Sequence, residues 1–272
     1  MTGRAKVVAG REALLEVVGL RKNFGGVRAL EKLDLTIAAG ELVGLIGPNG
    51  SGKTTAFNLL TGVLKPSGGR IVFRGAEVAG NRPEQNARLG MARTFQNIRL
   101  FRDLPVIDNV AVGVHMRHGV GFWPTILRFP AALRSEATIR DRTLAVLEIL
   151  DLRARSDDLV ASLPYGDQRK VEFARALATE PSLLLLDEPS AGMNPQETAE
   201  LGATIARLHR ELGLAIILVE HDMKMIMTHC QRILVMHQGR ILAEGSPEQV
   251  QQDRRVIEAY LGRRREGAHA VA

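Results

Sequence analysis

The chain has 272 residues, of which 45% are hydrophobic and 24% are charged, and this ordinary balance excludes wholesale disorder. The 36 basic and 30 acidic residues give a formal net charge of +6, which favours anionic ligands without choosing among nucleic acid, lipid and nucleotide. The single cysteine, Cys230, excludes an intrachain disulfide, and we expect it to be a small buried residue.

No stretch of the sequence reaches the roughly 18 apolar residues of a membrane span. The most apolar candidate, residues 119–133, is interrupted by Pro124, Arg128 and Pro130. The first eleven residues lack the apolar run of a signal peptide. We therefore expect a chain that is soluble and cytoplasmic by itself and that reaches a membrane only through a partner.

The N-terminal third of the chain has the pattern of strands around a glycine-rich loop. Apolar residues alternate with charged ones in the first strands, whereas Leu42–Ile46 is continuously apolar, as in a strand buried on both faces. In chain order we expect strands at 14–20, 27–29, 33–37 and 42–46, a loop at 47–52, a helix at 53–61 and a strand at 70–73.

Helical periodicity replaces the strand pattern from 97 to 161, most clearly at 138–150. The β/α alternation then returns, with helices expected at 167–179, 195–212, 223–228 and 247–260, and strands at 183–186, 214–219, 232–236 and 241–243. This order predicts a single α/β domain over 14–262. Residues 14–96 and 162–246 form its core, 97–161 a helical insert, 247–262 a C-terminal helix, and 1–13 and 263–272 tails.

The loop at 47–55 matches G-x-x-x-x-G-K-[ST] and stands between a predicted strand and a predicted helix. Glycines let consecutive backbone N–H groups point inward, and the helix N-terminus adds partial positive charge. Lys53 is expected on the β- and γ-phosphates and the Thr54 hydroxyl on Mg²⁺. The predicted binding residues are Gly47, Pro48, Asn49, Gly50, Ser51, Gly52, Lys53, Thr54 and Thr55.

Two carboxylates, Asp187 and Glu188, end the apolar strand at 183–186. Burying them there is costly unless they serve a metal or phosphate site. We expect Asp187 to hold Mg²⁺, directly or through water, and Glu188 to polarise the attacking water. Glu220 also ends a predicted strand and is an alternative base.

Three further residues are candidates by their positions. His221 follows a predicted apolar strand and can contact the γ-phosphate. Gln96 lies where the α/β part meets the helical part, which suits a sensor of the γ-phosphate or of a metal-bound water. Phe24 follows the first strand, where its ring either stacks on adenine or packs in the ordinary way.

These residues closely resemble the ATP-binding-cassette (ABC) ATPases over residues 14–262. The resemblance implies a RecA-like P-loop core with an antiparallel β subdomain and an inserted α-helical subdomain, and it implies ATP hydrolysis with Mg²⁺. The loop resembles Walker A and 183–188 resembles Walker B. Gln96 is similar to the Q-loop glutamine, which is also a metal candidate, and His221 to the switch histidine. Residues 190–194 occupy the D-loop, with Asn194 at the usual aspartate position.

The signature motif, usually Leu-Ser-Gly-Gly-Gln, is matched from Leu163 to Asp167 with Pro164, Tyr165 and Asp167 departing from it. The serine that Pro164 replaces normally meets the γ-phosphate of ATP held by the other subunit. Its loss is expected to weaken the closed dimer by on the order of 1 kcal/mol. Gly166 and a helix start remain, so backbone N–H groups can still face phosphate.

A Tyr-Gly-Asp-Gln signature is similar to the ATPase subunits of branched-chain amino acid importers. Residues 94–101, the longer insert at 119–137 and the ending at 259–262 are similar to the same subfamily. The resemblance implies a second ATPase subunit, identical or different, and two transmembrane permease subunits. It also implies a solute-binding protein as an indirect partner, and a peripheral position on the cytoplasmic side of the membrane. Arg99, Phe101 and 119–129 are the candidate permease contacts.

Other functions stay open at this point. Urea or amide importers are related systems, and a lipopolysaccharide-type exporter subunit is a further alternative, although its signature and shorter insert fit less well. Cassette ATPases that act on nucleic acid or the ribosome carry two cassettes, long coiled-coil inserts or zinc-binding cysteines, none of which this sequence has. We therefore expect no nucleic-acid partner. A non-hydrolysing scaffold is disfavoured because Glu188 and His221 are both present.

Overall fold

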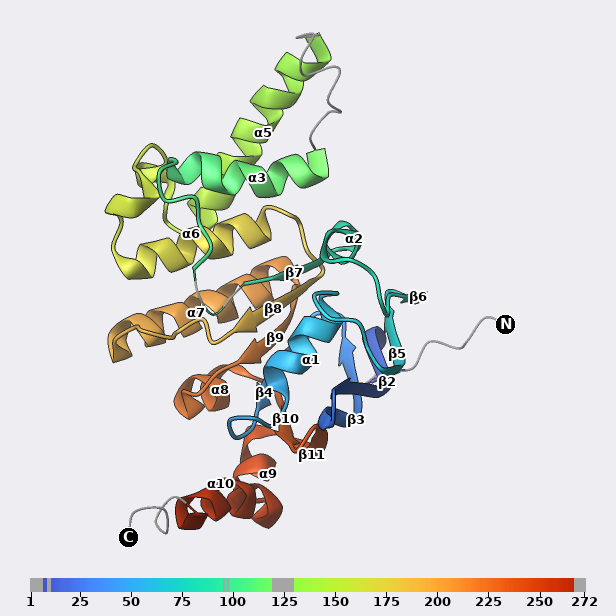
Figure 1. Cartoon of the computed structure of the whole chain (residues 1–272). Helices are drawn as coiled ribbons and strands as arrows, with labels where there is room; N and C mark the ends of the chain where they lie inside the picture. Colours follow the sequence, from blue (N-terminus) through green and yellow to red (C-terminus); the bar gives the residue numbers. More distant parts are fainter. Residues whose placement is uncertain (1–6, 9–10, 95, 97, 119–129, 267–272) are drawn as a thin grey trace.

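The computed structural model of the chain describes residues 7–8, 11–94, 96, 98–118 and 130–266. In this part, eleven strands form one mixed sheet, ordered β6-β5-β2-β3-β11-β10-β4-β9-β8-β7, with β1 paired to β2 (Figure 1). The strands are β1 Val7–Val8, β2 Arg11–Phe24, β3 Val27–Ala38, β4 Leu42–Ile46, β5 Gly68–Phe73, β6 Ala76–Glu77, β7 Met91–Arg93, β8 Leu183–Asp187, β9 Ala215–Val219, β10 Arg232–His237 and β11 Arg240–Gly245.

The described helices are α1 Lys53–Leu60, α2 Pro83–Leu89, α3 Val106–His118, α5 Pro130–Ile149, α6 Tyr165–Leu177, α7 Pro195–Leu212, α8 Met223–His229, α9 Pro247–Gln252 and α10 Arg254–Glu266. Two 3₁₀ turns, Arg153–Arg155 and Val160–Ser162, join α5 to α6. Among the described residues, no helix is long and apolar enough to cross a membrane.

The sheet has a parallel half and an antiparallel half. β10, β4, β9, β8 and β7 pair in parallel, so their carboxyl ends lie along one edge. β2 pairs antiparallel with β3 and β5, and β5 pairs antiparallel with β6. β11 joins the halves, because it pairs antiparallel with β10 and parallel with β3. The parallel half therefore places the loops after β4, β8 and β9 side by side, where α/β sheets bind ligands.

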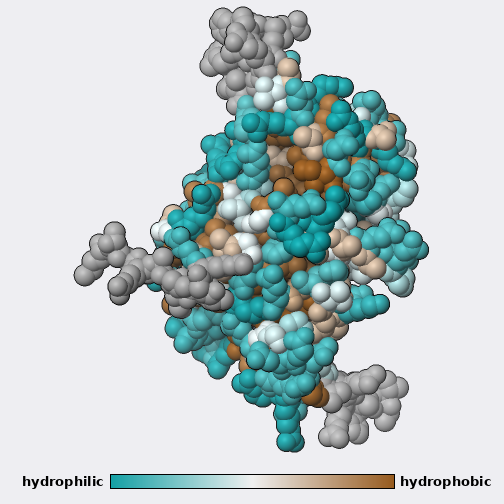
Figure 2. Space-filling model, turned by 180° about the vertical axis from the view of Figure 1, so that it is seen from behind, coloured by the Kyte–Doolittle hydropathy of each residue, from teal (hydrophilic) through white to brown (hydrophobic). Residues whose placement is uncertain are grey.

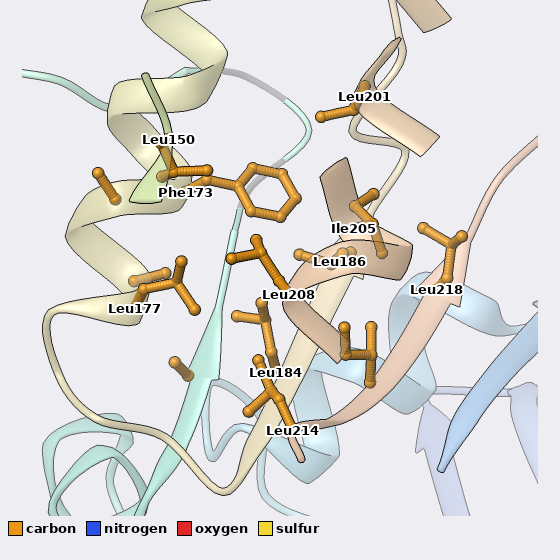
Figure 3. Packing of buried hydrophobic residues seen from close by; sticks show 14 of the residues in the cluster. Leu150, Phe173, Leu177, Leu184, Leu186, Leu201, Ile205, Leu208, Leu214 and Leu218 are labelled. Carbon is orange, nitrogen blue, oxygen red and sulfur yellow. The ribbon is translucent and has the colours of Figure 1, made fainter. Parts of the chain in front are cut away.

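The central strands are apolar throughout because both faces of the sheet are covered. In β8, Leu184 and Leu186 belong to the cluster that includes α6 and α7, whereas Leu183 and Leu185 belong to the cluster that includes α1. Figure 3 shows side chains of the first cluster packed against one another from α6, β8, α7 and β9: Phe173, Leu177, Leu184, Leu186, Leu208 and Leu218. The period of two along each strand distributes its residues between the two layers.

The helical part, α3, α5 and α6, lies beyond the β7–β8 side of the sheet (Figure 1). α3 and α6 approach closely at Gly113, where a Cβ would stand 2.4 Å from the carbonyl oxygen of Arg175. Asn109, fully buried, shapes the entry to α3 by bonding the backbone of Phe101, Leu104 and Pro105. Within 97–161, the described residues include the two helices α3 and α5 and the 3₁₀ turn Arg153–Arg155.

The structure corrects several predicted elements. The strands expected at 27–29 and 33–37 are one strand, β3, because its pairing with β2 continues through the polar residues between them. Four short elements, β1, β6, α2 and β7, were not predicted from the sequence. The single C-terminal helix expected from 247 is two helices, because Asp253 adopts an extended conformation that ends α9. β2 begins at Arg11 and α10 continues to Glu266.

The predicted bounds of Leu42–Ile46 and Pro195–Leu212 are confirmed as β4 and α7. α7 starts where the sequence indicates, because the side chain of Asn194 accepts hydrogen bonds from the first N–H groups and Pro195 occupies the first turn. The division into core, insert and C-terminal helix stays a prediction. The segment 119–129 lies outside the described residues.

Candidate active site

The phosphate-binding loop joins β4 to α1 and is shaped by glycines. Gly47 has φ 152°, and a Cβ there would lie 2.2 Å from the carbonyl oxygen of Met236. Gly52 has φ 106°, in the left-handed region that favours glycine. Lys53 Nζ donates to the carbonyl oxygen of Gly47 at 2.7 Å and to that of Pro48 at 3.3 Å, so the ammonium group lies within the curve of the loop.

A cavity of about 780 Å³ opens beside this loop. Eight of the predicted site residues line it, among them Asn49, Gly50, Gly52, Thr54 and Thr55 of the loop. Phe24, Lys53 and Glu188 line it as well, so residues from three distant segments share one cavity. Pro48 and Ser51 line a different hollow, of about 650 Å³, which the loop shares with Arg255 and Glu258 of α10.

The loop fits a polyphosphate. Ser51 Oγ is buried and has no hydrogen-bond partner among the described residues. Thr54 is exposed at the first turn of α1, where helix N–H groups and the dipole favour negative charge. The ammonium group of Lys53 supplies a cation beside the backbone carbonyls of Gly47 and Pro48.

Glu188 follows β8 in a strained conformation and is held from three sides. Its φ is 49°, which is unusual for a residue with a side chain and costs on the order of 1 kcal/mol. Its N–H donates to the carbonyl oxygen of Val219 at 2.9 Å. Gln96 Nε2 donates to Oε2 at 2.7 Å, and His221 Nε2 lies 2.7 Å from Oε1. The structure therefore brings the three predicted catalytic side chains together, because Gln96 and His221 both contact the carboxylate of Glu188.

The structure separates the two candidate bases. Glu220 is 4% exposed and accepts hydrogen bonds from the backbone N–H groups of Ser190 and His221, at 2.7 and 3.2 Å. Burial raises the pKa of the Glu220 carboxyl above its ordinary value. Glu188, in contrast, lines the cavity beside the loop. Of the two carboxylates, Glu188 is therefore the one that lines the cavity, whereas Glu220 holds the backbone after β8 and β9.

Asp187 has a partner that the sequence analysis missed. Arg93 Nη2 lies 2.7 Å from Asp187 Oδ2, and both side chains are buried, at 8% and 5% exposed. Arg93 also donates to Asn58 Oδ1 at 2.6 Å and stands over the ring of Phe57. Arg93 could not be predicted as a partner of Asp187, because β7, the short strand that carries Arg93, was itself not predicted.

Phe24 lines the cavity and is 46% exposed. Lys22 Nζ stands 5.0 Å from the ring centroid, a cation–π contact. Stacking on adenine stays a prediction.

The signature residues lie apart from the loop within this chain. Pro164 is the N-cap of α6, which starts at Tyr165, and none of the four predicted signature residues, Pro164, Tyr165, Gly166 and Asp167, lines the cavity beside Lys53. Asp167 stands 3.6 Å from Lys170 Nζ and 3.5 Å from Arg155 Nη1. Tyr165 OH instead donates to the carbonyl oxygen of Ala191 at 2.9 Å.

Comparison with known proteins identifies the family of this chain. Residues 30–191 match the family described as "ABC transporter". The chain belongs to this family. Residues 240–266 of the cassette also match a family described as "Branched-chain amino acid ATP-binding cassette transporter". The predicted family is confirmed, and so is the predicted α/β cassette fold.

The cassette is 45% identical to the high-affinity branched-chain amino acid transport ATP-binding protein LivG of Escherichia coli K12. That match covers 92% of this chain and 98% of LivG. Identity is 42% to BraF of Pseudomonas aeruginosa, named for the same transport, and 32% to the lipopolysaccharide export ATP-binding protein LptB of E. coli K12. A solved ATP-binding cassette of an ABC transporter in its ADP conformation superposes with a TM-score of 0.80 at 28% identity, over 92% of this chain and 99% of that one.

Proposed function

We infer that the cassette hydrolyses ATP with Glu188 as the base and powers an importer of branched-chain amino acids. The observation that carries this inference is the carboxylate of Glu188, which lines the same cavity as Lys53 and contacts Gln96 and His221. A general base needs to be within hydrogen-bond reach of the water it activates, and a cavity-lining carboxylate meets that requirement.

The residues divide the work as follows. Lys53 and the N–H groups of the loop bind the phosphates of ATP. Glu188 accepts the proton of the attacking water, while Gln96 and His221 fix the orientation of its two oxygens. The left-handed backbone of Glu188 keeps the carboxylate at the strand end in one direction.

Thr54 and Asp187 supply oxygen ligands of the kind that Mg²⁺ prefers. In the described part of the chain, no group of three or more His, Cys, Asp or Glu could hold a metal ion. A magnesium ion here would take its remaining ligands from phosphates and water, as it usually does, and would neutralise phosphate charge. Gln96 is a further candidate for contact with its water shell.

A second ATPase subunit completes the site. Pro164, Tyr165, Gly166 and Asp167 stand away from the cavity of their own chain, so the signature serves the phosphates held by a partner. The N-terminus of α6 offers backbone N–H groups and a positive dipole for this purpose. The partner is a second copy or a different cassette.

An apolar groove between the sheet and the helical part is the docking site that we assign to a permease subunit. It encloses about 260 Å³ and is lined by Val63, in the turn after α1, and by parts of α2, β7, α3 and α6, including Met91, Val112 and Met116. Val63, Val112 and Met116 are exposed, although apolar side chains favour burial. Figure 2 shows, from behind, a mostly hydrophilic surface with a hydrophobic hollow in its upper part. Such docking places the cassette on the cytoplasmic side of the membrane.

The earlier candidates for this contact remain predictions. Phe101 is 52% exposed, as a docking residue requires, and Arg99 belongs to the same connection before α3. The third candidate, 119–129, lies outside the described residues. A solute-binding protein outside the membrane is an indirect partner in this proposal, and the cassette has no nucleic-acid partner.

The relatives point to the transported solute. Identity to LivG exceeds identity to LptB by 13 percentage points over alignments of similar length (45 − 32). The C-terminal match at 240–266 supports the same choice. Branched-chain amino acids are therefore the favoured cargo, ahead of lipopolysaccharide.

The purified chain with Mg²⁺ and ATP tests the chemistry through three variants. Glu188→Gln is expected to retain ATP and to lower phosphate release at least about 100-fold, because the amide cannot accept the proton. Lys53→Ala is expected to lose ATP binding itself. Glu220→Gln, the matched control, should keep hydrolysis. Undiminished hydrolysis in Glu188→Gln together with its loss in Glu220→Gln would assign the base to Glu220.

A further inference from the structure

Arg169 is a fully buried cation in α6 that the proposed chemistry does not use. Its side chain is 1% exposed, and Nη1 lies 3.0 Å from Oε2 of Glu172, which is equally buried. Nη2 donates to the carbonyl oxygen of Gln96 and, at 3.0 Å, to the hydroxyl oxygen of Tyr165. The guanidinium group thus joins the signature helix to the residue that contacts the catalytic carboxylate.

Tyr165 extends this link to the D-loop. Its OH donates to the carbonyl oxygen of Ala191 at 2.9 Å while accepting from Arg169. A Cβ on Gly192 would stand 3.5 Å from the Tyr165 ring, so the ring lies against the D-loop backbone. A tyrosine hydroxyl can donate and accept at once, which neither phenylalanine nor a glycine at this position can do.

The contacts close into a ring around the base. Ala191 N–H donates to the carbonyl oxygen of Glu188 at 3.1 Å, and Gln96 Nε2 donates to the Glu188 carboxylate at 2.7 Å. The positioning ring therefore runs from Glu188 through Gln96, Arg169, Tyr165 and Ala191 back to Glu188. It joins segments that lie up to 92 positions apart in the sequence.

We propose that Tyr165 and Arg169 are positioning residues that tie the signature helix to the catalytic carboxylate of the same subunit. The inference rests on the proposed function, because it takes Glu188 as the base. The N-terminus of α6 serves the partner's ATP, whereas Glu188 serves the ATP of its own chain. The ring therefore transmits displacement of α6 by the partner's phosphates to the base, and it gives the departing residue Tyr165 a role in coupling the two ATP sites.

The hydroxyl of Tyr165 makes both hydrogen bonds that connect Arg169 to the D-loop. Removing this hydroxyl should therefore affect the orientation of Gln96 and Glu188 more than the binding of ATP. Tyr165→Phe keeps the aromatic side chain against Gly192 and beside the guanidinium group of Arg169. It removes both hydrogen bonds of the hydroxyl. We expect kcat to fall about tenfold with less than a twofold change in KM for ATP, because small displacements of a catalytic group lower the rate of the chemical step. Arg169→Lys keeps a cation beside Glu172 but loses the planar fork, and the same kcat loss is expected.

Ser162→Ala is the matched control. Its hydroxyl donates to the carbonyl oxygen of Leu159 at 2.7 Å, directly before the signature, and has no part in the ring. The control should leave kcat within twofold of the parent chain. Thermal unfolding of all variants is recorded, since a merely structural role would lower the unfolding temperature and the kcat together.

The decisive measurement is Tyr165→Phe in a Gln96→Ala background. Once Gln96 no longer contacts Glu188, the ring is already open, so the second substitution should lower kcat by less than twofold. A full tenfold further loss would overturn the proposal, as would a Tyr165→Phe variant with unchanged kcat. If Glu188→Gln itself keeps hydrolysis, the proposed base is wrong; if only Tyr165→Phe is without effect, the positioning ring alone is wrong.

Discussion

Replacing Arg93 by methionine leaves the Asp187 carboxylate buried without the cation it contacts at 2.7 Å. Two charges about 4 Å apart attract by about 4 kcal/mol at an effective dielectric constant of about 20. Removing one partner of a buried pair costs about 3–5 kcal/mol by measurement in other proteins. Both values agree, so we expect Arg93→Met to lower the free energy of unfolding by about 3 kcal/mol.

Urea denaturation of Arg93→Met, Asp187→Asn and the double variant isolates the pair. Because each single substitution strands the other partner, the double variant should be more stable than the sum of the single losses by about 2 kcal/mol or more. With an m-value of about 3 kcal/mol/M, a loss of about 3 kcal/mol lowers the urea midpoint by about 1 M.

The exposed pair Arg254–Glu258 on α10 is the control. Arg254 Nε lies 3.1 Å from Glu258 Oε1, and the two side chains are 91% and 66% exposed. Two single variants and the double variant of this exposed pair give its coupling free energy in the same way. That coupling should be at most about 0.5 kcal/mol, because solvent screens the charges. A coupling at Arg93–Asp187 as small as this would refute the argument that burial makes the pair strong.

Two further predictions concern packing and pH. Gly113→Ala should destabilise the fold by about 1–3 kcal/mol, because its Cβ would meet the carbonyl oxygen of Arg175 at 2.4 Å, whereas Gly26→Ala, with nothing within 4 Å, should not; equal urea midpoints would contradict this. Burial raises the pKa of the Cys230 thiol to about 12. The unfolded chain then loses this proton first, so stability should fall as pH rises from about 9 towards 12, by up to about 1.4 kcal/mol per pH unit, and Cys230→Ala should remove that part of the slope. Rapid reaction of native Cys230 with a disulfide reagent at pH 8 would show that the thiol is not buried.

The sequence predicted best where one local pattern decides the structure. Leu42–Ile46 is apolar without interruption, and only a strand covered on both faces accommodates such a run at that length. Pro195–Leu212 carries its own start signal in Asn194 and its own end in Gly213, which has φ 62°. The glycine-rich loop is likewise encoded in consecutive residues.

Elements without such local signals were missed. β7 has three residues and gains its pairing only from β8, through Met91 and Leu183, which are far apart in the chain. Asp253 breaks the C-terminal helix because its carboxylate contacts the N–H and the guanidinium group of Arg255. Helical periodicity alone does not reveal such a break.

The sequence by itself determined that the chain holds phosphate and that Asp187 and Glu188 end a buried strand, because loop glycines and strand hydrophobicity act over a few neighbouring residues. Only the tertiary structure decided which carboxylate faces the cavity, that Arg93 contacts Asp187, and that Arg169 joins Tyr165 to Gln96. These contacts span 94 positions for the first pair and 73 for Arg169 and Gln96. Parallel strands and packed helices place such distant side chains together, and no local pattern records which of them will meet.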